Sequence, residues 1–143
     1  MDLSTLYTEI ILQHSRNSQN RRQLPCATCK ERGHNPTCGD DITIELQVED
    51  GRVVDAAFTG QGCAISQAST SMMIDLVRGK TTAEAQQLID MFLAMIRQEL
   101  GSDVDLNALG DAIALQGVAQ MPARVKCAVL AWHTLKEALK TGA

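Results

Sequence analysis

The sequence predicts an α+β fold in which a small antiparallel β-sheet is accompanied by several α-helices. Apolar and polar residues alternate strictly over residues 42–48, which is the period of a strand with one buried face. Asp50-Gly51 follows as a hairpin turn signal. Helical periodicity precedes this hairpin and dominates the second half of the chain. With no internal repeat or low-complexity linker in 143 residues, we expect a single domain spanning residues 1–143.

The composition excludes several classes of protein. Hydrophobic residues make up 45% of the chain and aromatic residues only 3%, so we expect an aliphatic core. A net charge of −4 argues against a nucleic-acid partner, because phosphate binding needs a basic surface. No run of apolar residues is long enough to span a membrane, and the start of the chain lacks the basic region of a signal peptide. We therefore expect a cytoplasmic protein without membrane or nucleic-acid partners.

Apolar residues at helical spacing from Leu3 to His14 predict an amphipathic first helix. His14 has no partner four residues away, so we interpret it as a partly buried histidine and not as a metal ligand. Residues 15–36 are polar and rich in arginine and lysine, which predicts either a solvated loop or a docking surface for an acidic partner. This segment contains a C-x-x-C pair, Cys26 and Cys29. Free thiols, a redox-labile pair or auxiliary sulfur acceptor, and a second metal site all remain open for it.

Residues 52–59 are expected to form the second strand of the hairpin. We place three of its apolar residues on one face: Val54, Ala56 and Phe58. A helix is predicted over residues 64–78, with Gly79 as its C-terminal stop. Cys63 therefore lies at a helix N-terminus, where the free backbone N–H groups favour a thiolate.

A capping box formed by Thr81 and Glu84 starts the next helix, which we expect to end at Gly101. Residues 103–118 are less regular, and we expect a short helix from about Leu106 to Leu115 there.

Pro122 suits the first turn of a last helix. Its inner face is predicted to hold Cys127, Ala131, Leu135, Ala138 and Leu139. For Trp132 we expect ordinary core packing.

Four residues of this pattern have the chemistry of a metal and sulfur site. Cys38 and Asp40 place a thiolate and a carboxylate two positions apart in a turn with proline and glycine. The antiparallel hairpin returns the chain to its starting point, so Cys63 is expected to lie beside Cys38, and Cys127 enters from the last helix. Five cysteines in a reducing compartment favour metal binding or thiol chemistry over structural disulfides.

Three sulfurs and one oxygen suit zinc, iron or an iron–sulfur cluster. Around a divalent cation these ligands carry a net charge of about −2, and a buried site of that charge needs compensation. Arg124, one helical turn before Cys127, and Lys126 are candidates for this role. The alternative is that both are ordinary solvated charges of a helix.

Eight stretches of the chain together resemble one known family: Leu6-Tyr7, Gln13-His14-Ser15-Arg16-Asn17, Asn35-Pro36-Thr37-Cys38-Gly39-Asp40, Gly62-Cys63-Ala64-Ile65-Ser66, Ala68-Ser69, Ser71-Met72-Met73, Ala114-Leu115-Gln116-Gly117-Val118 and Pro122-Ala123-Arg124-Val125-Lys126-Cys127. The sequence resembles the NifU N-terminal-domain-like scaffold proteins of iron–sulfur cluster assembly. Within them it is more similar to the SufU branch than to IscU. Residues 102–117 correspond to a SufU-type insertion, and Lys126 stands where IscU-type scaffolds have a histidine.

The resemblance implies a SufE/NifU-like α+β fold and a zinc site formed by Cys38, Asp40, Cys63 and Cys127. It further implies that Cys38 accepts persulfide sulfur from a SufS-type cysteine desulfurase. Arg124 matches a family arginine close to the metal. The C-x-x-C pair departs from the family pattern.

The function implied is that of a zinc-dependent sulfur acceptor, or sulfurtransferase, which activates a desulfurase and is not a stand-alone enzyme. The alternative is a scaffold on which Cys38, Cys63 and Cys127 hold a transient [2Fe–2S] cluster. Its partners would then include apo iron–sulfur proteins or a SUF scaffold. A third possibility is a metal-stabilised interaction module without sulfur chemistry.

Overall fold

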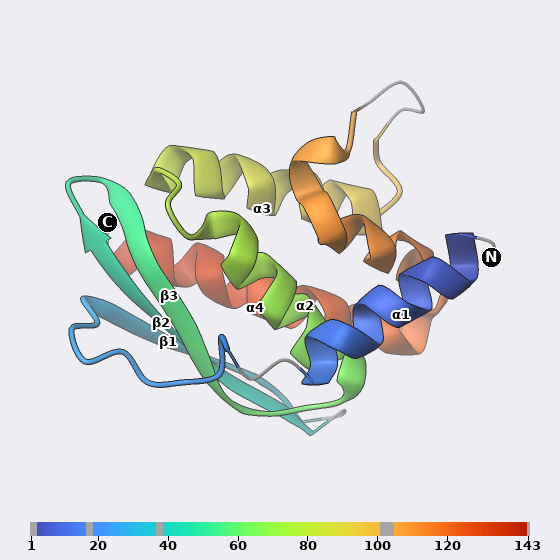
Figure 1. The fold of residues 1–143 in the computed structure, drawn as a ribbon, viewed down its shortest axis with the longest axis horizontal. Coiled ribbons are helices and arrows are strands. Elements are labelled where there is room, and N and C mark those ends of the chain that lie inside the picture. The colour runs from blue at the N-terminus through green and yellow to red at the C-terminus, as the bar shows by residue number, and fades with distance from the viewer. Residues whose placement is uncertain (1–2, 17–18, 37–38, 101–104, 143) are drawn as a thin grey trace.

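The computed structural model of this protein describes residues 3–16, 19–36, 39–100 and 105–142. Figure 1 shows one small sheet with the helices gathered on one of its sides. In chain order, the described elements are α1 (Leu3–Arg16), β1 (Cys29–Asn35), β2 (Asp40–Glu49), β3 (Arg52–Gln61), α2 (Ala64–Val77), α3 (Thr82–Ile96), the 3₁₀ helix η1 (Asn107–Gln120) and α4 (Pro122–Gly142). The expected α+β class is confirmed.

The sheet has the strand order β1-β2-β3, and both pairings are antiparallel. The predicted hairpin is present, and Asp50 and Gly51 at its turn both have positive φ. The inner face of β2 is formed by Ile42, Ile44 and Leu46, which are fully buried. Helix α2 packs against β3, and α4 packs against β1 and β2. These two helices therefore cover the apolar face of the sheet.

Strand β1 was not predicted, and the expectation of an irregular segment over residues 15–36 is wrong for it. The strand pairs with β2 from Cys29 opposite Leu46 to Asn35 opposite Asp40. Its buried residue is Gly33, where a Cβ would overlap the hydroxyl group of Thr134 on α4. Because β1 packs through bare backbone, the sequence carries no apolar alternation there.

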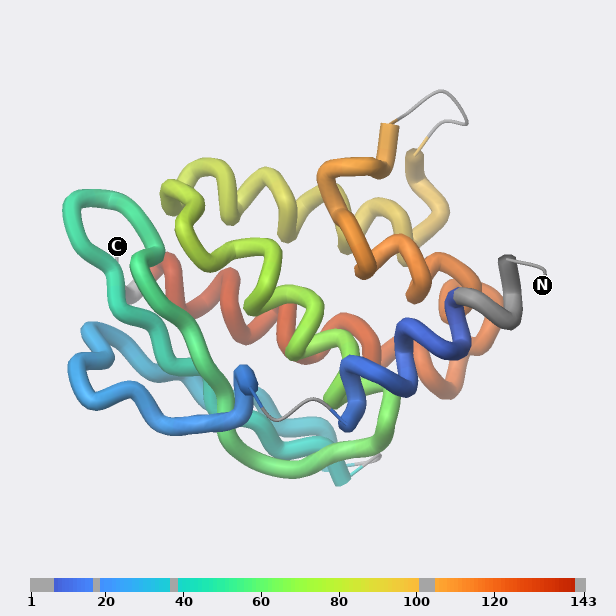
Figure 2. The backbone as a smooth tube through the Cα atoms, in the orientation of Figure 1, coloured from blue at the N-terminus to red at the C-terminus, as the bar shows by residue number. Residues whose placement is uncertain are grey.

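Residues 20–22 are hydrogen-bonded to the sheet, unlike a solvated loop. The backbone N–H of Phe58 donates to the carbonyl of Asn20 at 2.8 Å, and the N–H of Arg22 donates to the carbonyl of Phe58 at 3.0 Å. Figure 2 shows this segment passing alongside β3 before the chain turns into β1. The outer edge of β3 is therefore partly covered.

The expected position of Val54 on the buried face of β3 is also wrong. The strand register shifts between Gln47 and Val48, so that Gln47 pairs with Asp55 and Val48 pairs with Val53. Val54 is the extra residue of this β-bulge and is 38% exposed, whereas Val53 is buried. Ala56 and Phe58 are buried as predicted.

Helix α2 is buried on nearly every side, and small polar residues join it to its neighbours. Ser69 Oγ donates to the carbonyl of Ala128 at 2.6 Å and accepts from Trp132 Nε1 at 2.8 Å. The indole of Trp132 stacks on Phe92, with ring centroids 4.0 Å apart. The predicted core position of Trp132 is therefore confirmed.

His14 is buried near the end of α1, as predicted. Its Nδ1 lies 3.0 Å from Ser71 Oγ on α2, and its Nε2 lies 3.0 Å from Asp111 Oδ2 on η1. The imidazole therefore joins three helices.

The capping box of α3 is confirmed, with Thr81 and Glu84 each bonded to the other's backbone. The helix ends at Ile96, five residues before the predicted stop at Gly101, which lies outside the described residues.

The short helix predicted over residues 106–115 is instead the 3₁₀ helix η1, which continues past Gly117 and is kinked at Gly110 (φ 52°). The buried apolar residues of η1 include four spaced three apart: Leu109, Ala112, Leu115 and Val118. This is the repeat of a 3₁₀ helix and not of an α-helix.

Helix α4 begins at Pro122, and all five residues predicted for its inner face are buried. Among the helices of the described residues, none has the length and apolarity that a membrane span requires.

Candidate metal centre

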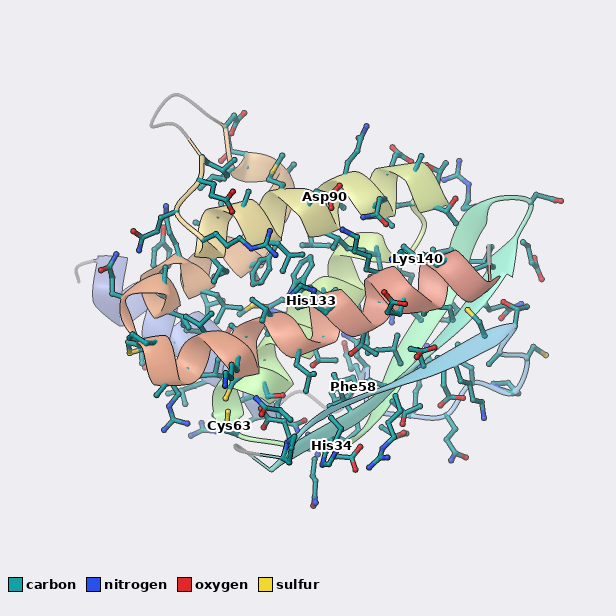
Figure 3. The ribbon with its side chains drawn as sticks, turned by 180° about the vertical axis from the view of Figure 1, so that it is seen from behind. His34, Phe58, Cys63, Asp90, His133 and Lys140 are labelled. Carbon is teal, nitrogen blue, oxygen red and sulfur yellow. The ribbon has the colours of Figure 1, made fainter. Side chains whose placement is uncertain are left out.

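Three elements bring Asp40, Cys63 and Cys127 together at one end of the sheet. Asp40 is the first residue of β2, Cys63 is the N-cap of α2, and Cys127 lies in the second turn of α4. One carboxylate oxygen and the two Sγ atoms all lie within 4.8 Å of one another. Figure 3 shows Cys63 where the end of the sheet meets the first turns of α2 and α4. The structure therefore brings together three of the four predicted ligands.

The strand pairing explains why Asp40 and Cys63 are neighbours. Asp41 pairs with Gln61 at the open end of the hairpin, so Asp40 and Cys63 both lie just beyond this last pair. The backbone N–H of Cys63 donates to Asp40 Oδ1 at 3.1 Å. This hydrogen bond fixes the orientation of the carboxylate.

The other carboxylate oxygen, Asp40 Oδ2, is the feature that most directly indicates a cation. Asp40 is fully buried, and Oδ2 has no hydrogen-bond partner among the described residues. A buried acceptor without a partner costs about 1–3 kcal/mol, and more if it is charged. A metal ion bound by this oxygen and two thiolates would remove that cost. The donor set of sulfur and oxygen fits zinc or iron.

Gly62 makes the close approach of these groups possible. A Cβ at this position would lie 2.7 Å from Asp40 Oδ1 and 2.9 Å from Ser66 Oγ. Any other residue would push the carboxylate or the helix away. The N–H of Ser66 donates to Cys63 Sγ at 3.4 Å, so the first turn of α2 already stabilises negative charge on that sulfur.

Cys38, the fourth predicted ligand, lies outside the described residues. Arg124 and Lys126 are exposed on the first turns of α4, and no ion pair joins either of them to a described carboxylate. Both are therefore exposed positive charges in the same two turns of α4 that carry Cys127.

The C-x-x-C pair lies at the opposite end of the sheet. Cys29 pairs with Leu46, whereas Asn35, next to the cluster, pairs with Asp40. Six residues of strand separate the two ends by about 20 Å. Burial raises the pKa of the Cys29 thiol, a hydrogen bond involving Thr28 opposes this only in part, and Cys26 is exposed. Neither cysteine reaches the cluster in this arrangement.

Most of the positive charge expected over residues 15–36 is paired with acids of the sheet. Arg32 binds Asp41, Arg22 binds Asp55, and Lys30 lies 3.5 Å from the buried carboxylate of Glu45. This segment is therefore less suited to an acidic partner than its composition indicates.

An apolar groove of about 870 Å³ begins directly beside Cys63, and the sequence did not predict it. Residues of α1, the first turn of α2, η1 and the start of α4 line it, and none of them is charged. Ile65 contributes from α2, and Met121, 46% exposed, contributes from the turn before α4. The available sequence signal was an apolar residue, Met121, directly before the helix-starting Pro122.

Comparisons with known proteins identify the family of this chain. The family model described as "NifU-like N terminal domain" matches residues 6–141. The chain is 44% identical over 140 residues to "Iron-sulfur cluster assembly scaffold protein IscU" of Thermotoga maritima, covering 98% of this chain and 96% of that protein. It is 39% identical over 137 residues to "Zinc-dependent sulfurtransferase SufU" of Bacillus subtilis, covering 95% and 90% respectively.

Two solved structures have the same fold. One is the crystal structure of FiSufU, described as an iron–sulfur cluster assembly scaffold protein for the SUF system, from Fervidobacterium islandicum AW-1. It has a TM-score of 0.87 and 37% identity, and the match covers 94% of this chain and 97% of that chain. The other is the N-terminal part of a NifU-like protein from Brucella abortus, with a TM-score of 0.83, 25% identity and coverage of 96% and 94%.

Proposed function

Because this chain belongs to the NifU-like N-terminal domain family, we propose that it serves iron–sulfur cluster assembly as a zinc-dependent sulfur acceptor. Its relatives of known name include a cluster assembly scaffold and a zinc-dependent sulfurtransferase. The observation that carries the proposal is the cluster of buried Asp40, half-buried Cys63 and buried Cys127, in which one carboxylate oxygen lacks a partner among the described residues.

We assign four zinc ligands: Cys38, Asp40, Cys63 and Cys127. Four protein ligands with thiolates in the majority are typical of a tetrahedral zinc site. When bound, zinc keeps its cysteine ligands deprotonated at neutral pH. The hydrogen bond from the Cys63 N–H holds Asp40 Oδ1 in place and leaves Oδ2 for the metal.

We assign the role of sulfur acceptor to Cys38. The other two cysteines are held by packed elements, since Cys63 caps α2 and Cys127 is 1% exposed on α4. Cys38 belongs to neither helix and precedes Asp40 by two positions, and two residues span at most about 7 Å. It therefore stays within reach of the cluster while being the ligand that is released at the lowest cost.

The transfer proceeds by thiolate attack. The Cys38 thiolate attacks the outer sulfur of a persulfide on the desulfurase. The sulfur–sulfur bond of the donor breaks, a new one forms to Cys38, and the donor cysteine leaves as a thiolate. No external oxidant or reductant is required, because one sulfur–sulfur bond replaces another.

We propose that the donor is a SufS-type cysteine desulfurase and that it docks over the groove beside Cys63. The groove offers an uncharged apolar surface, and the exposed side chains of Arg124 and Lys126, which pair with no carboxylate among the described residues, lie on the helix whose start borders it. A matching surface on the desulfurase would be apolar with carboxylates at one side. Thiolates need a reducing compartment, so we place this exchange in the cytoplasm.

Metal analysis and mass spectrometry test the proposal together. The purified protein is expected to hold one zinc per chain and to stimulate a cysteine desulfurase. After incubation with desulfurase and cysteine, a mass increase of one sulfur atom is expected on the peptide containing Cys38. The Cys38→Ala variant should lose stimulation even if it retains zinc. Sulfur on Cys63, Cys127 or the C-x-x-C pair would contradict the assignment.

The second candidate is a scaffold for a transient [2Fe–2S] cluster, favoured by the name of the relative that is 44% identical. Cys38, Cys63 and Cys127 would hold the cluster, and Asp40 would be its weakest and most exchangeable ligand. Anaerobic reconstitution would then give a coloured, oxygen-labile protein that transfers its cluster to an apo-protein or a SUF scaffold. Zinc without any effect on a desulfurase would instead indicate a metal-stabilised interaction module.

A further inference from the structure

Ser66 is a buried residue beside the cluster whose side chain has no assigned role. It is the third residue of α2 and is 1% exposed. Its hydroxyl oxygen has no hydrogen-bond partner among the described residues. Only one other buried side-chain atom in the described part of the chain shares this condition, and it is Asp40 Oδ2. Both residues also lie against Gly62, directly before Cys63.

The position of the hydroxyl group places it on the wall of the cluster. Ser66 Oγ and Asp40 Oδ1 lie on the same side of Gly62, 2.9 Å and 2.7 Å from the point that a Cβ on that glycine would occupy. The backbone N–H of the same serine donates to Cys63 Sγ at 3.4 Å. The first turn of α2 therefore contributes a backbone donor to Cys63 Sγ and places the Ser66 hydroxyl group on the same side of Gly62 as the Asp40 carboxylate.

Ordinary helix chemistry does not explain the serine. A polar residue at the third helical position often bonds back to the N–H of the N-cap residue. Here that N–H, on Cys63, already donates to Asp40 Oδ1. The hydroxyl group of Thr70, one turn later, bonds to the carbonyl of Ser66 at 2.8 Å, which shows the usual local solution for such a group. Ser66 Oγ makes no bond of this kind.

The two orphaned atoms have complementary chemistry but do not bond to each other. Asp40 Oδ2 is an acceptor that a cation would satisfy, and Ser66 Oγ–H is a donor that an anion would satisfy. A loaded centre supplies both, because it contains a metal ion and thiolate sulfurs. Hydrogen bonds to ionised acceptors are stronger than those between neutral groups.

We propose that Ser66 is a positioning residue of the metal centre, whose hydroxyl group donates a hydrogen bond to an anionic sulfur of the loaded site. This inference rests on the proposed metal centre but adds a residue to it. The hydrogen bond would spread the charge of the thiolate and hold the sulfur in its binding orientation. In the metal-free protein the hydroxyl would lack this acceptor and would carry only the cost of its burial.

The Ser66→Ala variant of the full chain is expected to affect the metal-free and the metal-bound protein differently. Without metal, its melting temperature should equal or exceed that of the wild type, because a buried group without a partner has been removed. With metal, its zinc affinity, measured by chelator competition, should fall about tenfold. In the cobalt-substituted protein the sulfur-to-metal charge-transfer band should move to lower energy, because the thiolate has lost a donor.

Thr70→Val is the matched control, since it removes a buried hydroxyl group one turn further along α2. That hydroxyl already has a partner, so its loss should lower the melting temperature of both forms and leave zinc affinity and the cobalt band unchanged. Unchanged zinc affinity and an unmoved cobalt band in Ser66→Ala would overturn the inference while leaving the metal centre intact. A wild-type protein that binds neither zinc nor cobalt would overturn the proposed centre itself, and the inference with it.

Discussion

Asp40→Asn is the substitution that tests the metal centre most directly. Asparagine has nearly the same shape as aspartate, and its carbonyl oxygen can keep the hydrogen bond from the Cys63 N–H, which is 3.1 Å long in the wild type. The second oxygen, which has no partner among the described residues, becomes an NH₂ group facing two sulfur atoms. The change therefore removes a metal ligand and a buried charge while preserving the local fold.

The expected effects on the metal-free and zinc-loaded forms have opposite signs. Without metal, the variant should be at least as stable as the wild type, because a neutral amide replaces a buried carboxylate whose second oxygen has no described partner. Zinc at about 100 times the wild-type dissociation constant stabilises the wild type by about 2.7 kcal/mol, and a hundredfold weaker site retains about 0.4 kcal/mol of that. For a chain of this length, the zinc-dependent rise in melting temperature should shrink by about 8 °C.

Differential scanning calorimetry with and without zinc, together with chelator competition, measures both effects. Asp41→Asn is the matched control, since it makes the same chemical change one residue later at a partly exposed carboxylate that pairs with Arg32. It should leave the zinc-dependent rise unchanged. If Asp40→Asn binds zinc as tightly as the wild type, Asp40 is not a ligand and the reasoning from its orphaned oxygen is wrong.

Three further predictions concern other parts of the molecule. Cys63→Ala should lose its zinc. The double variant Cys26→Ser/Cys29→Ser should keep it, because Cys26 and Cys29 lie at the far end of the sheet. Loss of half or more of the metal from the double variant would contradict the ligand set. Met121→Glu should weaken desulfurase binding about tenfold without changing zinc content, while Val54→Glu, at an exposed apolar residue of the β-bulge, should have no effect on binding. Asp55→Asn should lower stability by about 1 kcal/mol at pH 7, with the difference disappearing below about pH 4 in a pH series of melting temperatures.

The sign of the last prediction follows from the surroundings of Asp55. Burial raises the pKa of this carboxyl group, but hydrogen bonds from Arg22, the Ala56 N–H and Arg78 outweigh burial and lower it. A carboxyl group with a lowered pKa in the folded state stabilises the protein above the pKa of the unfolded state. That contribution is lost as the pH falls through the folded pKa. Acid should therefore bring the wild type and Asp55→Asn together.

Features that depend on local interactions could be predicted from the sequence. The alternation over residues 42–48 and the Asp50-Gly51 turn specified the β2–β3 hairpin. The capping box at Thr81 and the proline at position 122 marked the starts of α3 and α4. In each case the residues that determine the structure lie within a few positions of one another, so their preferences act without help from the rest of the fold.

Features that depend on packing between distant segments could not be predicted. Strand β1 lacks an apolar pattern because Gly33 lets α4 approach its backbone, and Val54 is exposed because a bulge shifts the register of β3. A short helix was expected where η1 lies. The buried residues of η1, spaced three apart, follow the repeat of a 3₁₀ helix instead. In each case, packing or pairing with a neighbouring element determined the local structure.

The candidate metal centre also combines features that depend on local interactions with features that depend on packing between distant segments. The types of ligand are apparent from the residues alone. The hairpin made Asp40 and Cys63 neighbours, because an antiparallel turn brings its two ends together whatever surrounds it. That Cys127 joins them depends on long-range packing, because it requires α4 to lie across β1 and β2. The tertiary structure also decided that Asp40 Oδ2 and Ser66 Oγ are buried without described partners. Whether a polar atom is satisfied depends on every group within hydrogen-bonding distance, and those groups come from three different elements.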